Sequence, residues 1–329
     1  MSRSWQRLTP TLKRFWMRLG AGLVLCSLFS VSHSATAQTC TVAPPALTFG
    51  TLNPYAATVT TTSGNGNISC NNPTTAAVAI YLCLSLGTGS GGTAPTNRTL
   101  ASGASKIPIT LKTGGSPGQV GNGTSYPMAG PITVNVPASQ TVNTAFSLIS
   151  TVPPPSPAPA PGSYTSTFAD ADTKIIYAVR TSTTTCPTLN SSAPKTAQGN
   201  FTISATVPTQ CSVTSTSMAF PISSLLTQPK DATATVSVTC NAAVPVTVGL
   251  DNGATGTGPT SRLMKSGTNA ITYGIYRDAA ASLPWGNIAG TNTAVRSGTG
   301  TLTAYGRVPA QTSPPPGSYA DVVNVVITY

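Results

Sequence analysis

The sequence predicts an all-β protein built from two tandem antiparallel β-sandwich domains of immunoglobulin type. Three observations carry this prediction: short segments in which apolar and polar residues alternate, turn-forming clusters between those segments, and a sequence pattern that occurs twice. Alternation with a period of two is typical of strands that bury one face. Repeating units of about 120 residues made of such strands favour a sandwich.

The first 37 residues have the composition of a secretory signal peptide. Five basic residues lie in the first half of this segment, residues 21–31 are apolar, and Ala35-Thr36-Ala37 is an A-x-A cleavage site. The apolar run is too short to span a membrane. We therefore expect a signal peptide at residues 1–37, cleavage after about Ala37, and export of a chain that begins near Gln38.

Removal of this segment changes the charge and the available chemistry. The remaining chain keeps 12 of the 17 Lys and Arg residues and all six Asp, a net charge of +6, and it has no His and no Glu. Its basic residues are scattered singly, without a run or a stripe. This pattern predicts a solvated, mildly cationic surface and no nucleic-acid partner.

Two parts of the chain repeat the same pattern in the same order. Each copy begins with a Cys followed nine residues later by a Phe, and a second Cys follows an alternating segment. An Arg with Ser-Gly four residues later and a Pro-Gly-Ser-Tyr motif complete the pattern. The paired positions are Cys40 and Cys211, Phe49 and Phe220, Cys70 and Cys240, Arg98 and Arg262, and Tyr164 and Tyr319. This order indicates a tandem duplication.

Both copies contain candidate strands separated by turn clusters, and no segment has a sustained helical period. In the second copy the candidate strands are residues 212–220, 234–240, 244–250, 270–277, 301–309 and 321–329. The first copy is larger. It continues through a candidate strand at 174–180 to a strictly alternating strand at Phe201–Val207, and its loops at 114–130 and 152–162 are rich in Gly and Pro.

Six Cys remain after the signal peptide, an even number in an exported chain, which indicates disulfide bonds. The repeat predicts Cys40–Cys70 and Cys211–Cys240, each joining the first strand of its copy to the second. Cys83 and Cys186 are then left to pair with each other within the first copy.

The residues that remain offer little for catalysis. General acid–base work usually needs His, Glu or Asp, and only six Asp are present. The one close pair, Asp170 and Asp172, is interpreted as an exposed bend before a strand. The Cys spacing fits no zinc site, and no Gly-rich segment precedes a helix. We therefore expect no enzyme activity, no cofactor and no metal site.

The second copy resembles the spore coat protein U domain, the pilin fold of Csu-type, or archaic, chaperone–usher pili. Besides Cys211, Phe220, Cys240 and Arg262, the residues that carry the resemblance are Tyr273-Gly274-Ile275-Tyr276-Arg277-Asp278, Trp285-Gly286, Tyr305-Gly306-Arg307-Val308-Pro309 and Gly317-Ser318-Tyr319-Ala320-Asp321. The first copy keeps the Cys-to-Phe-Gly opening, the Arg98 segment and Pro-Gly-Ser-Tyr. It lacks the Tyr-x-x-Tyr, Trp-Gly and Tyr-Gly-x-x-Pro elements.

The resemblance implies a pilin-type sandwich without its last strand, whose groove receives an N-terminal strand of the next subunit. It also implies a periplasmic chaperone that protects the groove and an outer-membrane usher that exchanges the strands. Here Phe201–Val207 occupies the donor position before Cys211 but can fill the first domain in cis through Phe201, Ile203, Ala205 and Val207. Only Gln38 and Thr39 separate the expected cleavage site from Cys40.

This arrangement implies a two-domain tip adhesin: residues 38–207 form a self-complemented adhesin domain, and residues 208–329 form a pilin domain that accepts a strand. Such a subunit promotes attachment to hydrophobic or host surfaces and biofilm formation from the pilus tip. The expected surface-binding residues lie on enlarged loops of the first domain: Leu52, Tyr55, Tyr126, Pro127, Met128, Val152, Pro153, Pro154, Pro155, Pro157 and Pro159. A non-adhesive initiator subunit and a secreted coat protein remain alternatives.

Overall fold

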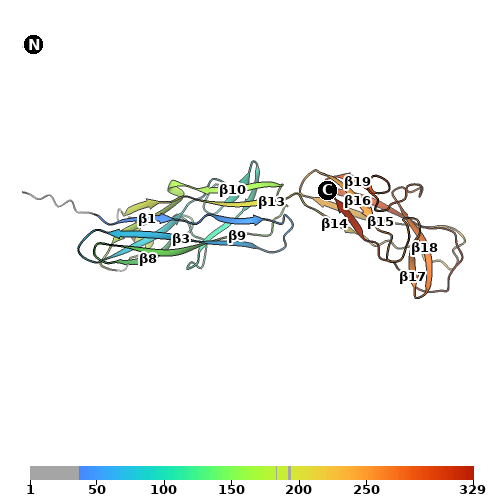
Figure 1. The fold of residues 1–329 in the computed structure, drawn as a ribbon, viewed down its shortest axis with the longest axis horizontal. Coiled ribbons are helices and arrows are strands. Elements are labelled where there is room, and N and C mark those ends of the chain that lie inside the picture. Colours follow the sequence, from blue (N-terminus) through green and yellow to red (C-terminus); the bar gives the residue numbers. More distant parts are fainter. Residues whose placement is uncertain (1–36, 183, 192–193) are drawn as a thin grey trace, which may run out of the picture. The chain divides into compact units, whose positions relative to one another are not determined.

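The computed structural model describes residues 37–182, 184–191 and 194–329. These residues form two immunoglobulin-like antiparallel β-sandwiches, and the second lacks its final strand (Figure 1). The predicted all-β class is therefore confirmed. The predicted signal peptide lies outside the described residues, apart from Ala37.

One layer of the first sandwich is a four-stranded sheet in the order β1-β3-β9-β7. Its long central strands pair along their whole length, from Thr60 opposite Val152 to Asn72 opposite Gln140. Inward residues such as Ile68 and Leu148 alternate with polar residues that face outward, as expected for a half-buried sheet. The strands are β1 (Thr39–Ala43), β3 (Thr60–Asn72), β7 (Thr110–Thr113) and β9 (Gln140–Val152).

The other strands of this sandwich form two shorter sheets, in the orders β12-β11-β4-β8 and β2-β13-β10-β5-β6. Their inward side chains share one core with the first sheet. The strands are β2 (Leu47–Thr51), β4 (Val78–Leu86), β5 (Thr99–Ser102), β6 (Ser105–Pro108), β8 (Ala129–Val136), β10 (Gly162–Phe168), β11 (Thr173–Val179), β12 (Lys195–Gln198) and β13 (Phe201–Val207).

A short helix interrupts the connection between β11 and β12, which the sequence did not predict. This helix, α1 (Cys186–Ser191), contains a cysteine bonded to Cys83 on β4. The bond packs with Met128, Ile176 and Leu189 in a small apolar cluster of its own. Asp170 and Asp172, predicted to lie in a bend, form a 3₁₀ turn, η1 (Asp170–Asp172), between β10 and β11.

The second sandwich has a five-stranded sheet, β14-β15-β20-β18-β17, and a three-stranded sheet, β19-β16-β21. Trp285 lies in its core, 1% exposed, and donates a hydrogen bond of 2.9 Å to the carbonyl of Val248. The strands are β14 (Cys211–Ser215), β15 (Lys230–Cys240), β16 (Pro245–Leu250), β17 (Arg262–Ser266), β18 (Asn269–Tyr276), β19 (Ala294–Ser297), β20 (Gly300–Val308) and β21 (Val325–Thr328).

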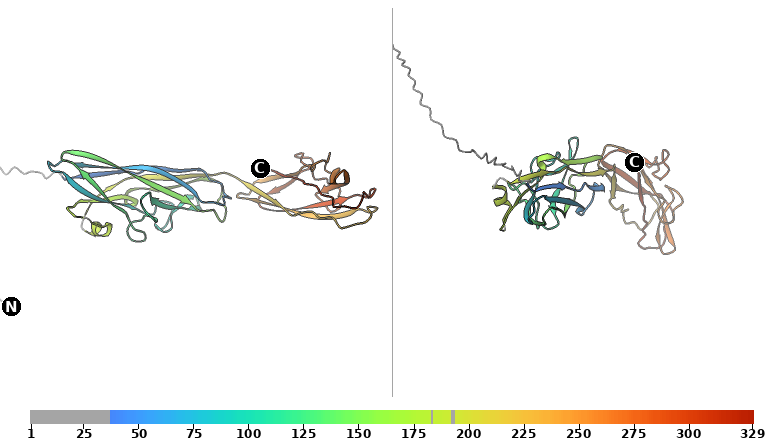
Figure 2. Two further views of the ribbon diagram at one scale, coloured as in Figure 1. Left: turned by 90° about the horizontal axis from the view of Figure 1, so that it is seen from below. Right: turned by 60° about the vertical axis from the view of Figure 1, so that its left-hand side comes forward.

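Two predicted strands of the second copy are much shorter than the sequence indicated. The predicted strand 212–220 ends at Ser215, and the predicted strand 321–329 is reduced to β21. Both lost portions flank the same opening, described below. No strand of the described residues fills this opening and supplies backbone hydrogen bonds to both portions, so alternation alone does not make them strands. Figure 2 gives two further views of the extended strands.

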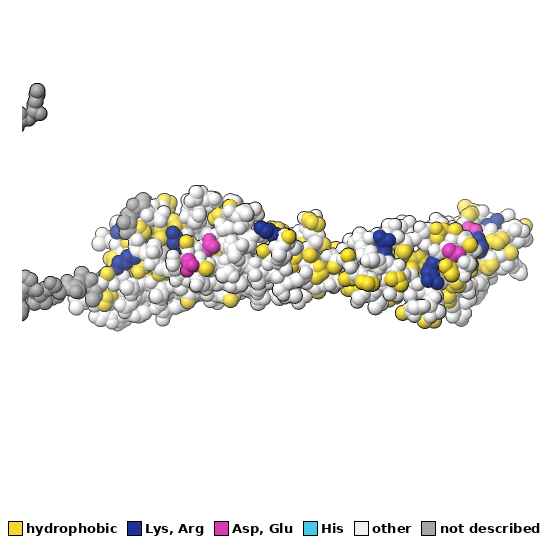
Figure 3. Space-filling view, turned by 90° about the horizontal axis from the view of Figure 1, so that it is seen from above, with side chains coloured by type: hydrophobic (Ala, Val, Ile, Leu, Met, Phe, Trp, Pro, Cys, Tyr) yellow, Lys and Arg dark blue, Asp and Glu magenta, His cyan; other side chains and the backbone are white. Residues whose placement is uncertain are grey.

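The described cysteines form three disulfide bonds, which join Cys40 to Cys70, Cys83 to Cys186 and Cys211 to Cys240. In each copy the first two cysteines lie directly opposite each other in the register, so the bonds join β1 to β3 and β14 to β15. Charged side chains appear singly on the face drawn in Figure 3, without a continuous basic stripe.

Candidate strand-accepting groove

The strand β13 lies between β2 and β10 in one sheet of the first sandwich. It runs antiparallel to β10 and parallel to β2. Its four inward side chains, Phe201, Ile203, Ala205 and Val207, are at most 4% exposed, and all four belong to the main core. The last strand of this sandwich therefore comes from the segment that leads to Cys211.

The register places each inward residue of β13 opposite one residue of β10. Phe201 faces Phe168, and their rings stack with centroids 4.6 Å apart and planes 8° apart. Ala205 faces Tyr164, whose hydroxyl donates a hydrogen bond of 2.6 Å to the carbonyl of Ala160 and lies 2.7 Å from Ser105 Oγ, which can donate to it. Directly opposite residues pack on each other. The large ring of Tyr164 is therefore accommodated by the small side chain of Ala205.

The second sandwich has an open groove with a volume of about 410 Å³. One wall consists of residues 215–220, which follow β14, and the other of residues 319–325, which lead into β21. Apolar side chains of the core form its floor, including Val236, Leu250, Ile275 and Ala304. The groove therefore opens directly onto the core of this sandwich.

The repeat shows that this groove corresponds to the position of β13. Phe49 of the β2 wall matches Phe220, and Tyr164 of β10 matches Tyr319. The strand pairing agrees with this alignment. Thr165 faces Ala101 in the first sandwich, and the residues at the matching positions of the second, Ala320 and Lys265, also face each other. The hydroxyl of Tyr319 donates a 2.8 Å hydrogen bond to the carbonyl of Pro315, as Tyr164 does to Ala160 four residues upstream.

Among the described residues, no strand pairs with the edge beside the groove. The strand β11 pairs with both β4 and β12, whereas β21 pairs only with β16. Of ten large apolar side chains that are exposed among the described residues, eight lie in the second sandwich. Val322 and Val326, beside or on β21, are 70% and 50% exposed. Exposed apolar residues beside an unpaired strand edge are an association hazard unless another strand covers them.

Hydrogen bonds hold the wall of the groove at Asp321. Its carboxylate accepts a hydrogen bond from the Tyr273 hydroxyl at 2.7 Å and from the backbone N–H of Ala254 at 2.9 Å. Burial raises the pKa of Tyr273, and its hydrogen bond to Asp321 raises the pKa further. Tyr273 therefore stays protonated and keeps donating to Asp321.

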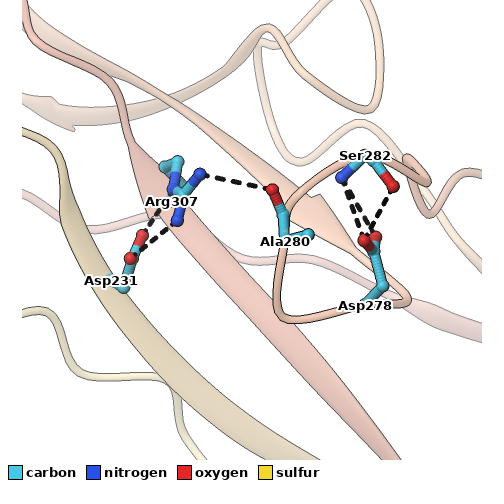
Figure 4. Close-up of polar contacts among 5 residues, drawn as sticks. All are labelled: Asp231, Asp278, Ala280, Ser282 and Arg307. Carbon is cyan, nitrogen blue, oxygen red and sulfur yellow. Dashed lines mark hydrogen bonds and ion pairs between the residues drawn. The ribbon is translucent and has the colours of Figure 1, made fainter.

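An ion pair joins the two strands that support the floor. Arg307 of β20 binds Asp231 of β15 through Nε at 2.7 Å and Nη2 at 2.9 Å (Figure 4). The hydrogen bond from Arg307 lowers the pKa of Asp231. In the adjacent turn, Asp278 accepts hydrogen bonds from the backbone N–H and the hydroxyl of Ser282. These contacts hold the strand ends and the turn beyond them.

The structure corrects four of the predicted surface-binding residues. Leu52, Val152, Met128 and Pro159 are buried, so they cannot form an exposed apolar surface in this conformation. Leu52 and Val152 pack in the main core, and Met128 packs beside the Cys83–Cys186 bond. Of the others, Pro127, Pro154 and Pro157 are exposed, and Tyr55, Tyr126, Pro153 and Pro155 are half-buried.

The proline loop lies at the end of the first sandwich from which the chain continues to Cys211. Gly162, which follows this loop, pairs with Val207, the last residue of β13. The opposite end carries the loops at 73–77 and 137–139, where Asn72 pairs with Gln140 and Val78 with Val136. Pro73, Ala76, Ala77 and Pro137 are exposed there, and sequence patterns did not indicate them.

No three His, Cys, Asp or Glu side chains of the described residues gather closely enough to hold a metal ion. Within the same residues, no helix has the length and apolar character needed to cross a membrane.

Two immunoglobulin-like sandwiches, one completed by its own chain and one open along a strand edge, define a pilin-type class of fold. The sequence profile of the Spore Coat Protein U domain matches residues 25–170 and 197–326, and the chain belongs to this family. The second match includes β13, although this strand lies in a sheet of the first sandwich.

The solved structures that match the chain include pilus proteins. The CsuC–CsuE chaperone–tip adhesion subunit complex from archaic Csu pili of Acinetobacter baumannii is 16% identical, with a TM-score of 0.47, over 88% of this chain and 100% of that chain. The CupB6 tip adhesin of Pseudomonas aeruginosa is 12% identical, with a TM-score of 0.29, over 88% and 94% of the two chains. No curated protein sequence matches the chain.

Proposed function

We propose that this protein is the tip subunit of a chaperone–usher type pilus and that its second domain joins it to the fibre by accepting a strand. One observation carries the proposal: the groove of the second sandwich lies at the position that β13 fills in the first. Family membership supports it. The incoming strand runs antiparallel to residues 317–323 and parallel to residues 218–222, as β13 does to β10 and β2.

The proposal divides the chain into a signal peptide at 1–37, a self-complemented domain at 38–207 and a strand-accepting domain at 208–329. The strand β13 is already paired on both sides, so this strand is not free to complete a neighbouring subunit. A subunit that accepts without donating ends the fibre.

The partners follow from the chemistry of the groove. An open apolar core beside a free strand edge aggregates unless it is covered. A periplasmic chaperone covers the groove after export, an outer-membrane usher exchanges the chaperone for a pilin strand, and the adjacent pilin then completes the sandwich by β-augmentation. The mature protein is displayed at the cell surface and acts without catalysis.

Attachment to surfaces, and with it biofilm formation, is assigned to the first domain. Its exposed apolar residues include Pro154 and Pro157 of the proline loop and, at the opposite end, Ala76 and Ala77. Burial of such side chains against a hydrophobic surface needs no specific ligand. Double variants distinguish the regions: Pro154→Ser with Pro157→Ser, and Ala76→Asp with Ala77→Asp, compared in attachment assays at equal amounts of assembled pilus. If both variants attach normally, the role is that of a non-adhesive initiator.

The test of the main proposal uses a chain that fills its own groove. A short turn and a copy of residues 195–207 are added after Tyr329, so that the copy can return along β21 as β12 and β13 return along β11 and β10. The control carries Asp at the four inward positions of the added strand. Immunogold labelling is expected to find the natural chain at fibre ends and to find no self-filled chain on fibres. Labelling along the fibres contradicts a tip position. A secreted coat protein does not depend on strand exchange, so equal surface display of the natural and self-filled chains would favour that alternative.

A further inference from the structure

We propose that the groove selects an extended strand with four apolar inward side chains, of which the first is bulky and the third is small, and that Tyr319 determines the small position. This inference rests on the proposed function, because it concerns which strand the groove accepts. The template is β13, whose inward residues Phe201, Ile203, Ala205 and Val207 have this order and fill the equivalent position of the first sandwich.

The small position follows from the orientation of a tyrosine ring. In the first sandwich Tyr164 is fully buried opposite Ala205, and its hydroxyl is fixed to the carbonyl of Ala160. Tyr319 makes the equivalent bond to the carbonyl of Pro315 and lines the groove. Because the same bond orients both rings, the strand residue opposite Tyr319 meets a ring as Ala205 does. A larger side chain there must displace the ring.

The bulky position follows from a difference between the two copies. Phe201 stacks on Phe168 in the first sandwich, and the residue at the matching position of the second is Val323, which lines the groove. Valine occupies less volume than phenylalanine, so this end of the groove has room for an aromatic ring of the incoming strand.

The second position is tolerant because a flexible residue borders it. Ile203 lies beside Leu47 in the first sandwich, and the matching wall residue is Met218. Met218 packs over Gly306, where a Cβ atom would lie 2.1 Å from its Sδ. A methionine side chain has several rotatable bonds and can move to accommodate a branched neighbour.

The inward positions are expected to be uncharged. Asp321 is the one charged side chain among the described residues that line the groove. Its carboxylate already accepts hydrogen bonds from the Tyr273 hydroxyl and from the backbone N–H groups of Ala254 and Val322. It therefore offers little to a cation on the strand.

The experiment uses the full chain and a synthetic peptide of residues 199–208. The oxidised chain is refolded with increasing peptide, and the soluble yield and the melting temperature of the second domain are measured. The natural peptide is expected to protect the domain. A peptide with Ala205→Leu is expected to bind about 10- to 100-fold more weakly, as overpacking implies, whereas Phe201→Trp is expected to bind within about threefold of the natural peptide. Thr206→Leu, whose side chain points outward, is the matched control.

The outcomes separate the two levels of the proposal. If the natural peptide protects and Ala205→Leu protects equally well at the same concentrations, the size order is wrong while the accepting groove stands. If no peptide protects, the proposed function is contradicted, and the size order with it. A Tyr319→Ala chain is expected to bind the Ala205→Leu peptide at least about tenfold better than the unchanged chain does. The peptide comparison needs no altered chain, so it decides the question even if this variant does not fold.

Discussion

Tyr164 and Ala205 face each other directly across β10 and β13, and the ring of Tyr164 is completely buried beneath the strand. Its repeat partner, Tyr319, has the same backbone hydrogen bond but is half-exposed. The difference between these two tyrosines is the presence of one strand. The first sandwich is therefore an internal reference for the completed form of the second.

Substitution of Ala205 by Leu tests how tightly this pair is packed. The added methylenes must displace Tyr164 or shift β13, so we expect the first domain to lose about 1–3 kcal/mol of unfolding free energy. Urea unfolding followed by circular dichroism measures the loss. Thr206→Val, at an exposed position of the same strand, is the control and is expected to change stability by less than about 0.5 kcal/mol. Equal effects of the two variants contradict the packing described here.

Loss of the Cys83–Cys186 bond is expected to destabilise the first domain more than loss of Cys40–Cys70. The two bonds close loops with sequence separations of 103 and 30 residues. Loop-closure entropy then predicts a difference of about 1 kcal/mol between the two double-serine variants. Denaturant unfolding of both oxidised variants measures it. A larger cost for the short loop means that native packing around Cys40, rather than chain entropy, dominates.

The buried arginines of the two copies are expected to differ in their tolerance to lysine. Arg262 donates four hydrogen bonds to the carbonyls of Leu250, Asp251, Pro259 and Trp285, whereas Arg98 donates two, to Leu86 and Gly87.

A lysine ammonium cannot reproduce the planar fork of either arginine. We expect Arg262→Lys to cost about 2–4 kcal/mol and Arg98→Lys about 1–2 kcal/mol, because buried carbonyls lose their donors. Hydrogen exchange at β16 and β4 measures the two losses in the full chain. If the two variants lose equal unfolding free energy, the number of donated hydrogen bonds does not determine the loss.

Acid is expected to weaken the second domain through Asp231. The hydrogen bond from Arg307 lowers the pKa of this carboxyl in the folded state. A lowered pKa stabilises the fold above the ordinary pKa of aspartate, and this stabilisation is lost as the pH falls through the folded value. The side chains of Arg307 and Asp231 are 32% and 58% exposed. Solvent therefore screens the pair, and we expect acid to reduce the unfolding free energy by less than about 1 kcal/mol.

Melting temperatures at pH 7 and pH 3 measure this loss, and added salt is expected to reduce it. Asp231→Asn is expected to show a smaller pH dependence than the natural chain. An unchanged pH dependence in this variant assigns the acid effect to other groups.

Much of the fold could be predicted because the decisive signals are local and repeated. Alternation identified Phe201–Val207 as a strand, and its place before Cys211 connected it to the second copy. The predicted strands 212–220 and 321–329 were too long because strand formation there depends on a neighbour. No pattern within a single segment reports whether that neighbour is present.

The surface-binding residues were predicted less well, for a different physical reason. Proline and apolar loop residues fit both an exposed contact and a packed loop, and only three-dimensional packing decides between them. Leu52 and Val152 are buried in one core although they lie 100 residues apart in the sequence. The role of Tyr319 was also missed, since its motif identified the repeat without indicating that its ring faces an open groove.

Hydrogen–deuterium exchange of the full chain tests the central claim most directly. Residues 162–168 of β10 are covered by β13. The matching residues 317–323 meet β17 at Ala320, but no strand of the described residues pairs with them on the side of the groove. The account predicts that the amides of 317–323 and of β21 exchange much faster than those of β10 and β11. In the chain that carries the added copy of residues 195–207, the amides of 317–323 and β21 are expected to exchange as slowly as those of β10 and β11. If 317–323 is already as protected as β10 in the unmodified chain, the groove is closed and the strand-accepting account is wrong.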